Sequence, residues 1–353
     1  MILRIHRPSF DYHQTYEPLE KAARISDNNI VVLALPIIWP PKAVWITGKS
    51  KMIMERFLSV LTHLRLFGLV WKNRRRDMII LREFSNIPLL ISWPLLFTWN
   101  KKIYCLVNHN VQLANKNKIE RLALWLLSRM KCKFLCLEGK DGIEGAGVVL
   151  TERNVCVIPF PVVGSPKVNP TNREIKKNIG VIGRFRKEKG GDDLLNALYH
   201  ARSLGEFDAD ILLGCPEQEV LNLWDKPGIK TVNTTSSEMY ERAMDSCSVI
   251  VLNYEKDAYF YRHSGVITDA ISNFKTVVCP EYPLLRSQVK SPVTVGFTFR
   301  NLSEIGEVVN SALEFINSDC ETEFQKYHKY REPKAISKLL DLILSRKGAG
   351  KEE

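Results

Sequence analysis

The stretch GVIGRFRKEKGG, residues 180–191, joins an apolar strand-like run to a helix-like run through a glycine, a cluster of cations and two further glycines. Glycine lets the backbone approach a ligand closely, and the start of a helix offers free N–H groups to an anion. Arg184 and Lys189 add fixed positive charge. We interpret the stretch as a diphosphate site, distinct from a Walker loop because the pattern GxxxxGK followed by Ser or Thr is absent. Taken alone, it also fits a basic turn between a strand and a helix.

Short apolar runs alternate with longer mixed runs on both sides of this stretch. After it, strand-like runs recur at 208–214, 228–235, 248–254, 275–281 and 293–299, with helix-like stretches at 191–203, 237–246, 264–273, 302–317 and 335–345. Before it, they recur at 2–5, 29–38, 77–83, 102–108, 132–138 and 154–160, with helix-like stretches at 15–25, 51–72, 86–98, 115–130 and 140–147. Strands that are apolar on both faces and alternate with helices indicate a parallel sheet covered on both sides.

A segment rich in Pro, Gly, Ser and Asn, residues 161–177, interrupts the alternation and predicts a linker. We therefore expect an α/β fold of two Rossmann-like, doubly wound domains, 1–165 and 176–320, that face a central cleft. Ligands of such folds bind beyond the carboxyl ends of the strands. Residues 321–353 are expected to form a helical segment. In one possible arrangement, this segment packs back on the first domain.

The composition is that of an ordinary globular chain, with 45% of the 353 residues hydrophobic and 25% charged. No apolar run reaches the ~18–20 residues that span a bilayer. The start, MILRIHRPSF, lacks the apolar core of a secretion signal. Eight cysteines occur without a CxxC pair, mostly in strand-like runs, which favours reduced, buried thiols. We expect a cytoplasmic protein.

The positive charge is concentrated in one half of the chain. Residues 1–172 hold 25 Lys and Arg against 12 Asp and Glu, whereas residues 173–353 hold 25 against 27. So uneven a charge suggests that the first half has an anionic partner. Such a partner would be a membrane surface, a phosphorylated acceptor or nucleic acid. A charge that serves only solubility is the simpler interpretation.

A second polar segment follows the strand-like run 248–254. It continues through YEKDAYFYRH to a predicted helix that Ser264 and Gly265 open. N–H groups at that helix start would suit a second face of the same diphosphate. Asp269, about one and a half turns into the helix, suits hydrogen bonds to sugar or ribose hydroxyls. The alternative for Asp269 is a solvated helix charge.

Both segments resemble the C-terminal domain of the GT-B glycosyltransferases, especially the family 4-like group, over about residues 176–318. Those enzymes carry a G-R-x-x-x-x-K-G signature after a strand, and Gly183, Arg184, Lys189 and Gly190 match it in spacing. The resemblance implies a GT-B fold with a nucleotide-sugar donor in the second domain. It also implies that the matching arginine and lysine neutralise the donor diphosphate.

The same group carries two glutamates separated by seven residues, the second of which opens an E-A-x-A-x-G-x-P-V-V run. Here Asp269 stands at the second glutamate and Tyr261 at the first, with Asn273-Phe274 in place of a small residue and a glycine. The resemblance implies that Asp269 is a catalytic residue and that it contacts the donor sugar or nucleoside together with Tyr261 and Tyr254. The sugar and the retaining or inverting outcome stay open.

In the first half, the likeness to these enzymes is one of layout. The strand-like run 102–108 ends in Asn108-His109-Asn110, where many of them have a His-Asn pair facing the cleft. We predict His109 as a catalytic residue that hydrogen-bonds the sugar or helps to deprotonate the acceptor hydroxyl. A structural histidine is the alternative. Further candidate bases are Asp11, Glu17 and Glu83.

The stretch 51–76 predicts a basic amphipathic helix. Apolar residues recur at three- and four-residue intervals up to Trp71, and cations lie on the opposite side and at the end. Such a helix suits the interface of an anionic membrane, which Arg74, Arg75 and Arg76 would contact. An ordinary core helix shows the same apolar spacing.

Together these features favour a glycosyltransferase of the hexosyltransferase type in surface polysaccharide biosynthesis. It would move a sugar from a UDP- or GDP-sugar to a glycan or polyprenyl-linked acceptor, peripherally on the inner face of the membrane. No metal or other cofactor is expected, because two cations already neutralise the diphosphate. The DxD-spaced pair Asp208 and Asp210 lies at a strand start, the wrong end for a ligand.

Two other classes of protein stay open. A nucleotide-sugar epimerase of the same fold would need an acid–base set around the sugar, for which the chain offers few carboxylates. A non-catalytic RNA- or membrane-binding protein would use the basic half. We expect no nucleic-acid partner, because the aromatic and basic residues form no RNP-like or helix-turn-helix pattern.

Overall fold

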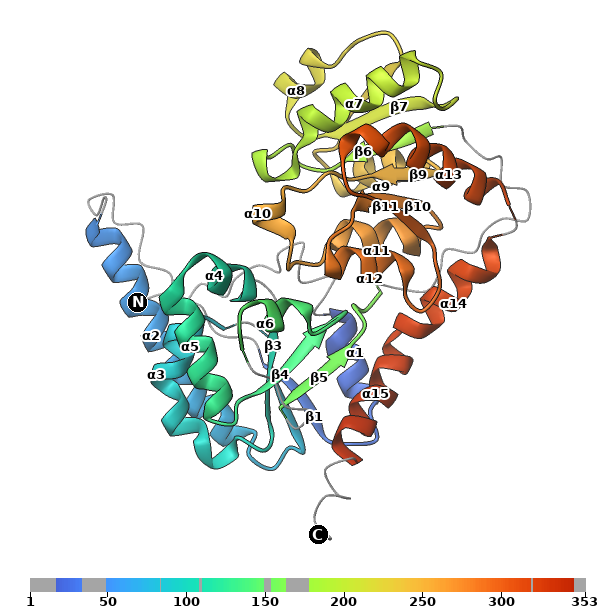
Figure 1. Cartoon of the computed structure of the whole chain (residues 1–353). Helices are drawn as coiled ribbons and strands as arrows, with labels where there is room; N and C mark the ends of the chain where they lie inside the picture. The colour runs from blue at the N-terminus through green and yellow to red at the C-terminus, as the bar shows by residue number, and fades with distance from the viewer. Residues whose placement is uncertain are drawn as a thin grey trace. The chain divides into compact units, whose positions relative to one another are not determined.

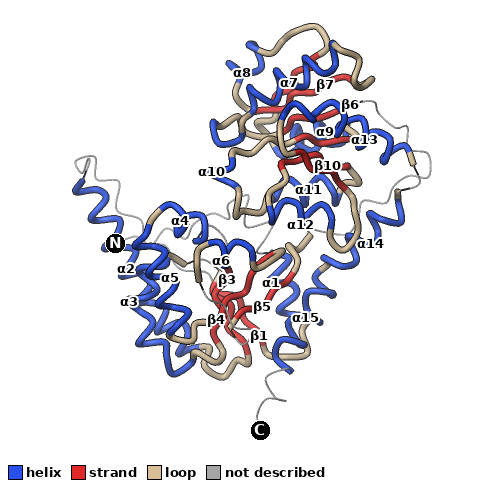
Figure 2. The backbone as a smooth tube through the Cα atoms, in the orientation of Figure 1, coloured by secondary structure: helices blue, strands red, loops and turns tan. Residues whose placement is uncertain are grey.

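The computed structural model describes residues 17–33, 49–82, 84–107, 110–148, 154–162, 178–318 and 320–345, with only the backbone described at 49–59. The chain divides into two compact units (Figure 1). Unit 1 comprises Met1–Pro159 and Pro333–Glu353, and unit 2 comprises Phe160–Glu332. Each unit is a parallel sheet with helices on both faces (Figure 2). The predicted α/β class with two parallel sheets is confirmed.

The described residues of unit 1 form a five-stranded parallel sheet in the order β1-β2-β3-β4-β5. Its strands are β1 Ile30–Leu33, β2 Met78–Leu81, β3 Ile103–Val107, β4 Lys133–Leu137 and β5 Val155–Ile158. Its helices are α1 Glu17–Ile25, α2 Lys49–Lys72, α3 Asn86–Leu96, η2 Phe97–Trp99, α4 Asn110–Lys116, α5 Lys118–Arg129, α6 Asp141–Gly145 and α15 Pro333–Ser345. β2 and β3 are buried along their whole length, as strands covered on both faces must be.

Two helical layers cover this sheet. α2, α3 and α5 lie side by side on one face, and α1 and α15 pack together on the other (Figure 1). The Asp341 carboxylate of α15 accepts hydrogen bonds from Ser26 and Asn28, just after α1. The last helix therefore packs within unit 1. Among the helices described, none is both long and apolar enough to cross a membrane.

In the part of unit 2 that the structure describes, six parallel strands form a sheet in the order β11-β10-β9-β6-β7-β8. Its strands are β6 Asn178–Ile182, β7 Asp210–Cys215, β8 Ile229–Asn233, β9 Val249–Val251, β10 Thr276–Pro280 and β11 Gly296–Phe299. Its helices are η3 Lys187–Lys189, α7 Gly191–Ser203, α8 Gln218–Leu223, α9 Ser237–Asp245, α10 Lys256–Tyr259, α11 Gly265–Ser272, α12 Pro283–Lys290, η4 Leu302–Glu304, α13 Ile305–Asn317 and α14 Glu321–Arg331.

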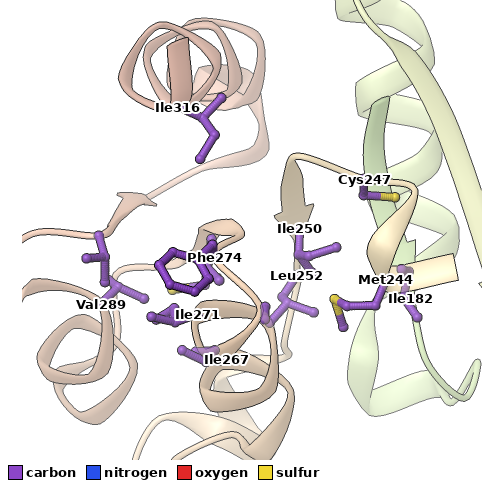
Figure 3. Packing of buried hydrophobic residues seen from close by; sticks show 14 of the residues in the cluster. Ile182, Met244, Cys247, Ile250, Leu252, Ile267, Ile271, Phe274, Val289 and Ile316 are labelled. Carbon is purple, nitrogen blue, oxygen red and sulfur yellow. The ribbon is translucent and has the colours of Figure 1, made fainter. Parts of the chain in front are cut away.

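The sheet of unit 2 separates two hydrophobic cores. Successive residues of a strand point to opposite faces, so Ile179 and Val181 of β6 pack with the apolar sides of α7 and α13. Ile182 instead joins a core with α9, α11 and α14. Figure 3 shows part of that second core, which includes Ile267 and Ile271 of α11 together with residues of strands, loops and other helices. The two cores hold the strand ends, and the loops that follow them, in fixed positions.

One fully buried arginine ties the beginning of unit 2 to its end. Arg331, the last residue of α14, donates hydrogen bonds to the carbonyl oxygens of Phe160 at 3.3 Å and Ser291 at 2.8 Å. Its guanidinium carbon lies 4.3 Å from the centre of the Tyr327 ring. In turn, the N–H of Val162 donates to the Arg331 carbonyl at 3.1 Å. Arg331 thus joins the segments at which the chain enters and leaves unit 2.

Candidate functional site in unit 2

The order of strands in unit 2 places a reversal between β6 and β9. The chain adds β7 and β8 on one side of β6, then returns to pair β9 with its other side and adds β10 and β11 beyond. The loops after β6 and β9 therefore leave the same edge of the sheet at neighbouring positions. Ligands of doubly wound sheets bind at such a switch point. Both polar segments singled out from the sequence follow these two strands.

The loop after β6 folds Lys189 back over Gly183. Gly183 has a φ of 131°, and the Lys189 Nζ lies 3.3 Å from the position that a Cβ on Gly183 would occupy. Glu217, just after β7, accepts a hydrogen bond from the Phe185 N–H at 3.2 Å and so fixes the middle of the loop. Arg184 is exposed. The loop thus presents a half-buried ammonium and an exposed guanidinium next to backbone that a ligand can approach.

The environment of Lys189 opposes its positive charge. Burial lowers the pKa of the Lys189 ammonium below the ordinary value of 10.5. The neighbouring Arg186 and Arg184 charges lower that pKa further, while Glu188 and Glu217 act in the opposite direction. An anion bound beside Lys189 would relieve the repulsion among the cations. A negatively charged ligand would therefore stabilise the charged form of Lys189 in this loop.

Hydrogen bonds join the loops after β6 and β9. The Asn253 amide donates to the Gly190 carbonyl at 3.0 Å, and the Glu255 N–H donates to the Glu188 carbonyl at 3.0 Å. Gly190 has a φ of 50°, and a Cβ there would lie 2.6 Å from the Asn253 Nδ2. The second glycine of the signature is thus required both by its conformation and by the close approach of Asn253.

Replacing Gly190 with alanine is expected to weaken nucleoside diphosphate binding and to destabilise unit 2. The left-handed conformation costs an alanine roughly 1–2 kcal/mol, and the added methyl pushes Asn253 away. Gly205→Ala is the matched control, because Gly205 has a φ of 73° but no atom within 4 Å of the added methyl. Thermal melts with and without UDP would compare them. Equal loss of ligand response in both variants would contradict the role of the Asn253 contact.

The loop after β9 ends in a buried network around Ser264. The Ser264 and Tyr254 hydroxyls are 2.8 Å apart, and the Ser264 N–H donates to the Gln288 Oε1 at 2.8 Å. The Gln288 amide donates back to the Ser264 carbonyl at 3.0 Å. The Ser264 amide proposed for the diphosphate is therefore engaged within the protein. The amides of the first turn of α11, from Gly265 on, lack partners one turn earlier in their own helix.

Tyr254 supports this network. Its side chain is 2% exposed and stacks on Tyr259 with 4.0 Å between ring centres. Tyr282 donates to its carbonyl at 2.8 Å, and burial raises the pKa of the Tyr254 hydroxyl far above its ordinary value. The tyrosine predicted to contact the donor is thus placed as a packing residue. Tyr261, half-buried, packs edge-on against Phe260 with ring centres 4.7 Å apart.

Asp269 lies beside a tyrosine that the sequence did not reveal. Burial raises the pKa of the Tyr240 hydroxyl well above 10.0, and the neighbouring Asp269 carboxylate raises it further. Tyr240 comes from α9, on the other side of β9 in sequence, so its place next to Asp269 depends on tertiary packing. The half-buried carboxylate and the phenol form a polar pair on the α9–α11 face of the sheet.

Outside the described residues lie the predicted catalytic His109 and the candidate bases Asp11 and Glu83. Glu17 is the exposed first residue of α1. Asn110 is buried at the start of α4, where its amide donates to the Phe84 carbonyl and its carbonyl accepts from the Asn86 amide at 3.2 Å. Asn110 therefore fixes the loops after β2 and β3 to each other.

The remaining charged candidates lie at amino ends of strands. The residues Arg74–Arg76 form the turn between α2 and β2, at the edge of the unit 1 sheet opposite to the start of α4. In unit 2, Asp210 is the first residue of β7, and its carboxylate pairs with Lys230 at 2.7 Å and Arg202 at 3.0 Å. Hydrogen bonding to Lys230 lowers the Asp210 pKa. Asp208 is exposed just before the strand.

Two Rossmann-like units in one chain are the architecture of GT-B glycosyltransferases, and comparison with solved structures confirms the GT-B fold. The chain is similar to the apo form of the lipopolysaccharide outer core galactosyltransferase WaaB, with a TM-score of 0.58 and 13% identity over 84% of this chain and 82% of that chain. It is also similar to HepE of Anabaena in complex with UDP-glucose, with a TM-score of 0.55 and 14% identity over 98% of each chain.

A further similar structure is the catalytic domain of starch synthase IV from Arabidopsis thaliana, bound to ADP and acarbose. Its TM-score is 0.54 and its identity 10%, over 82% of this chain and 76% of that chain. Neither a family model nor a curated protein matches the sequence. At these identities the comparisons establish the fold.

Proposed function

We propose that the protein is a glycosyltransferase that moves a sugar from a nucleoside diphosphate sugar to a glycan or polyprenyl-linked acceptor. The observation that carries the proposal is the Lys189 ammonium folded over Gly183 at the β6–β9 switch point, with Arg184 beside it. Structures of the same fold support it, because HepE is bound to UDP-glucose and starch synthase IV to ADP. Surface polysaccharide biosynthesis is the pathway that we propose.

In this proposal, Lys189 and Arg184 bind one side of the donor diphosphate. The backbone amides of the first turn of α11, which begins at Gly265, bind its second side. Negative charge builds on the diphosphate as the glycosidic bond breaks, so these groups stabilise the transition state more than the ground state. Because the two cations supply this neutralisation, the proposed reaction uses no metal or other cofactor. The pair of Asp269 and Tyr240 is proposed to hold donor hydroxyls, with Tyr261 nearby in sequence.

Unit 1 is proposed to hold the acceptor, with His109 as the residue that hydrogen-bonds the sugar or helps to deprotonate the acceptor hydroxyl. A polyprenyl-linked acceptor would place the enzyme peripherally on the inner face of a membrane. The basic character of the first half supports this assignment, since such acceptors carry phosphate.

A thermal-shift screen against UDP-, GDP- and ADP-sugars tests the proposed function. We expect nucleotide sugars with one particular nucleobase to raise the melting temperature. When an extract that contains the acceptor is added, that nucleotide sugar should release its nucleoside diphosphate. A protein that no nucleotide stabilises, and that binds RNA in a salt-dependent manner, would contradict the proposal. Conversion of the sugar nucleotide to an epimer without release of the diphosphate would instead identify an epimerase.

Donor affinity is expected to fall as the pH rises through the lowered pKa of Lys189 toward the ordinary lysine pKa of 10.5. The pKa of Lys189 is lowered in the free protein, and a bound diphosphate raises it because its charge favours the ammonium. The complex therefore binds more protons than the free protein in this window, and affinity declines with rising pH. Calorimetry in two buffers of different ionisation enthalpy measures the proton uptake. Lys189→Arg should lose this pH dependence, and an unchanged dependence would contradict the role of Lys189.

A further inference from the structure

Three neighbouring helices of unit 1 carry exposed apolar side chains. On α2, Trp71 is 49% exposed, on α3 Ile91 is 53% exposed, and on α5 Ile119 is 65% exposed. The three helices form one layer, with α2 next to α3 and α3 next to α5 (Figure 1). The exposed residues of the layer, which we call the outer face, include Leu64, Phe67, Trp71, Ile91, Leu95, Ile119 and Leu122.

The outer face is separate from the apolar residues that form the core. On the same helices Leu66, Trp93 and Leu124 are fully buried. In each helix the exposed residues recur at intervals of three or four, as residues on one side of a helix do. The core of unit 1 thus uses one side of the layer, and the outer face is a second apolar side. Packing of the core explains why the inner side of the layer is apolar, but it does not explain the apolar outer face.

Aromatic rings gather at the end of the outer face where α2 and α3 finish. The ring centres of Trp71 and Trp99 are 5.7 Å apart, and Phe67 lies 5.7 Å from Trp99. The Arg74 guanidinium carbon lies 4.7 Å from the centre of the Trp71 ring. Tryptophan and arginine together are typical of the boundary between lipid headgroups and acyl chains, where an amphipathic ring meets both environments.

The charge around the outer face is predominantly positive. Residues 60–131, which contain the three helix faces, hold 13 Lys and Arg and three Asp and Glu. Exposed cations of the layer and its turns include Arg65, Lys72, Arg75, Lys118, Arg121 and Arg129. An apolar face surrounded by cations matches a surface whose interior is apolar and whose rim is anionic.

We propose that the outer face of the α2–α3–α5 layer docks on an anionic membrane surface. The three helices lie in the plane of the interface, with Phe67 and Trp71 among the acyl chains. Arg74–Arg76 contact anionic headgroups. The docking surface belongs to unit 1, whereas the donor site belongs to unit 2, so docking extends the proposed function without depending on the donor residues.

Flotation of the full-length protein with vesicles tests this proposal. We expect the protein to float with phosphatidylcholine vesicles that contain phosphatidylglycerol, and far less with phosphatidylcholine alone. The apolar variant F67S/W71S and the charge variant R74Q/R75Q/R76Q should each lower vesicle affinity at least tenfold. Circular dichroism melts identify any variant that fails to fold.

Matched controls come from unit 2. L204S/L223S removes two exposed leucines, which are 63% and 64% exposed, and R242Q/R286Q/R300Q removes the same charge as the arginine variant. Both controls should float like the wild type. The thermal shift caused by UDP is also measured on the wild type and on every variant. If UDP causes no shift while the wild type still floats with anionic vesicles, only the donor-site proposal is contradicted.

Several results would overturn the docking proposal. One is a wild type that ignores anionic vesicles, and another is a pair of controls that lose as much affinity as the outer-face variants. A dimer in solution that F67S/W71S dissociates would assign the outer face to a second copy of the chain. Binding of RNA in place of vesicles, lost in R74Q/R75Q/R76Q, would assign the cations to nucleic acid.

Discussion

Lys189→Ala is expected to weaken nucleoside diphosphate binding by about 10- to 100-fold, since a hydrogen bond to a charged group contributes about 1.5–3 kcal/mol. The ammonium lies over Gly183, where a diphosphate can approach the backbone closely. The loss should appear in both donor and product affinity, because the diphosphate is common to them. Arg184→Ala is expected to act in the same direction but less, because Arg184 is exposed and its charge is better screened.

Lys187→Ala is the matched control for this experiment. Lys187 belongs to the same short helix η3 and is exposed, and removing it changes the net charge by the same amount. Calorimetric titration with UDP or GDP should give near wild-type affinity for Lys187→Ala. If Lys187→Ala and Lys189→Ala weakened binding equally, the effect would come from general charge, and the assignment of Lys189 would fail.

Arg331→Ala is expected to destabilise unit 2 by roughly 3–5 kcal/mol. The carbonyl oxygens of Phe160, in a buried bond, and Ser291, in a partly buried one, lose a charged donor, and each such bond contributes about 1.5–3 kcal/mol. The Tyr327 ring also loses the guanidinium that packs on its face. The melting temperature of this unit should fall by on the order of 10 °C.

The exposed Lys329, on the same helix α14, supplies the comparison for Arg331. Lys329→Ala removes a positive charge two residues away and should leave the melting temperature within about 1–2 °C of the wild type. Hydrogen exchange should show faster exchange at 160–162 in Arg331→Ala only. Normal protection there would contradict the view that Arg331 joins the ends of unit 2.

The strands of both sheets could be predicted because each is a short apolar run between polar segments. β8 to β11 fall inside the predicted runs, whereas β7 ends one residue beyond its run, at Cys215. The long helix α2 matches the predicted stretch apart from its first two residues. The helices α8, α10 and α12 have no counterpart among the predicted helices, whereas α14 lies in the segment 321–353 that is expected to be helical without bounds of its own. In α14 the sequence ETEFQKYHKYR is mostly polar, so the buried stripe of Phe324, Tyr327 and Arg331 gives little apolar signal.

The diphosphate loop could be predicted because its glycines and cations are contiguous in sequence. Glu217, Asn253 and Tyr240 could not, because each reaches the site from a different strand end or helix. Phe274 shows a further limit. It occupies the position at which the resembling enzymes have a glycine, and it adopts a φ of 56° while its ring is buried against Phe324. Packing of the ring offsets a conformation that glycine would adopt more easily.

The membrane-facing surface depends on how neighbouring helices pack. The sequence predicts one amphipathic helix, and its apolar spacing fits a core helix as well as a membrane helix. The structure separates the buried side of α2 from its exposed side and adds exposed apolar residues on α3 and α5. The order of the strands decides which helices lie next to each other, so the pattern of one helix alone does not show that α2, α3 and α5 are neighbours.

The most direct test of the donor site is hydrogen exchange of the full-length protein with and without the nucleoside diphosphate that stabilises it most. The account predicts slower exchange at residues 183–191 and 253–267, the loops after β6 and β9, and little change in unit 1. Protection confined to unit 1, or no protection at the two loops under saturating nucleotide, would contradict the central claim.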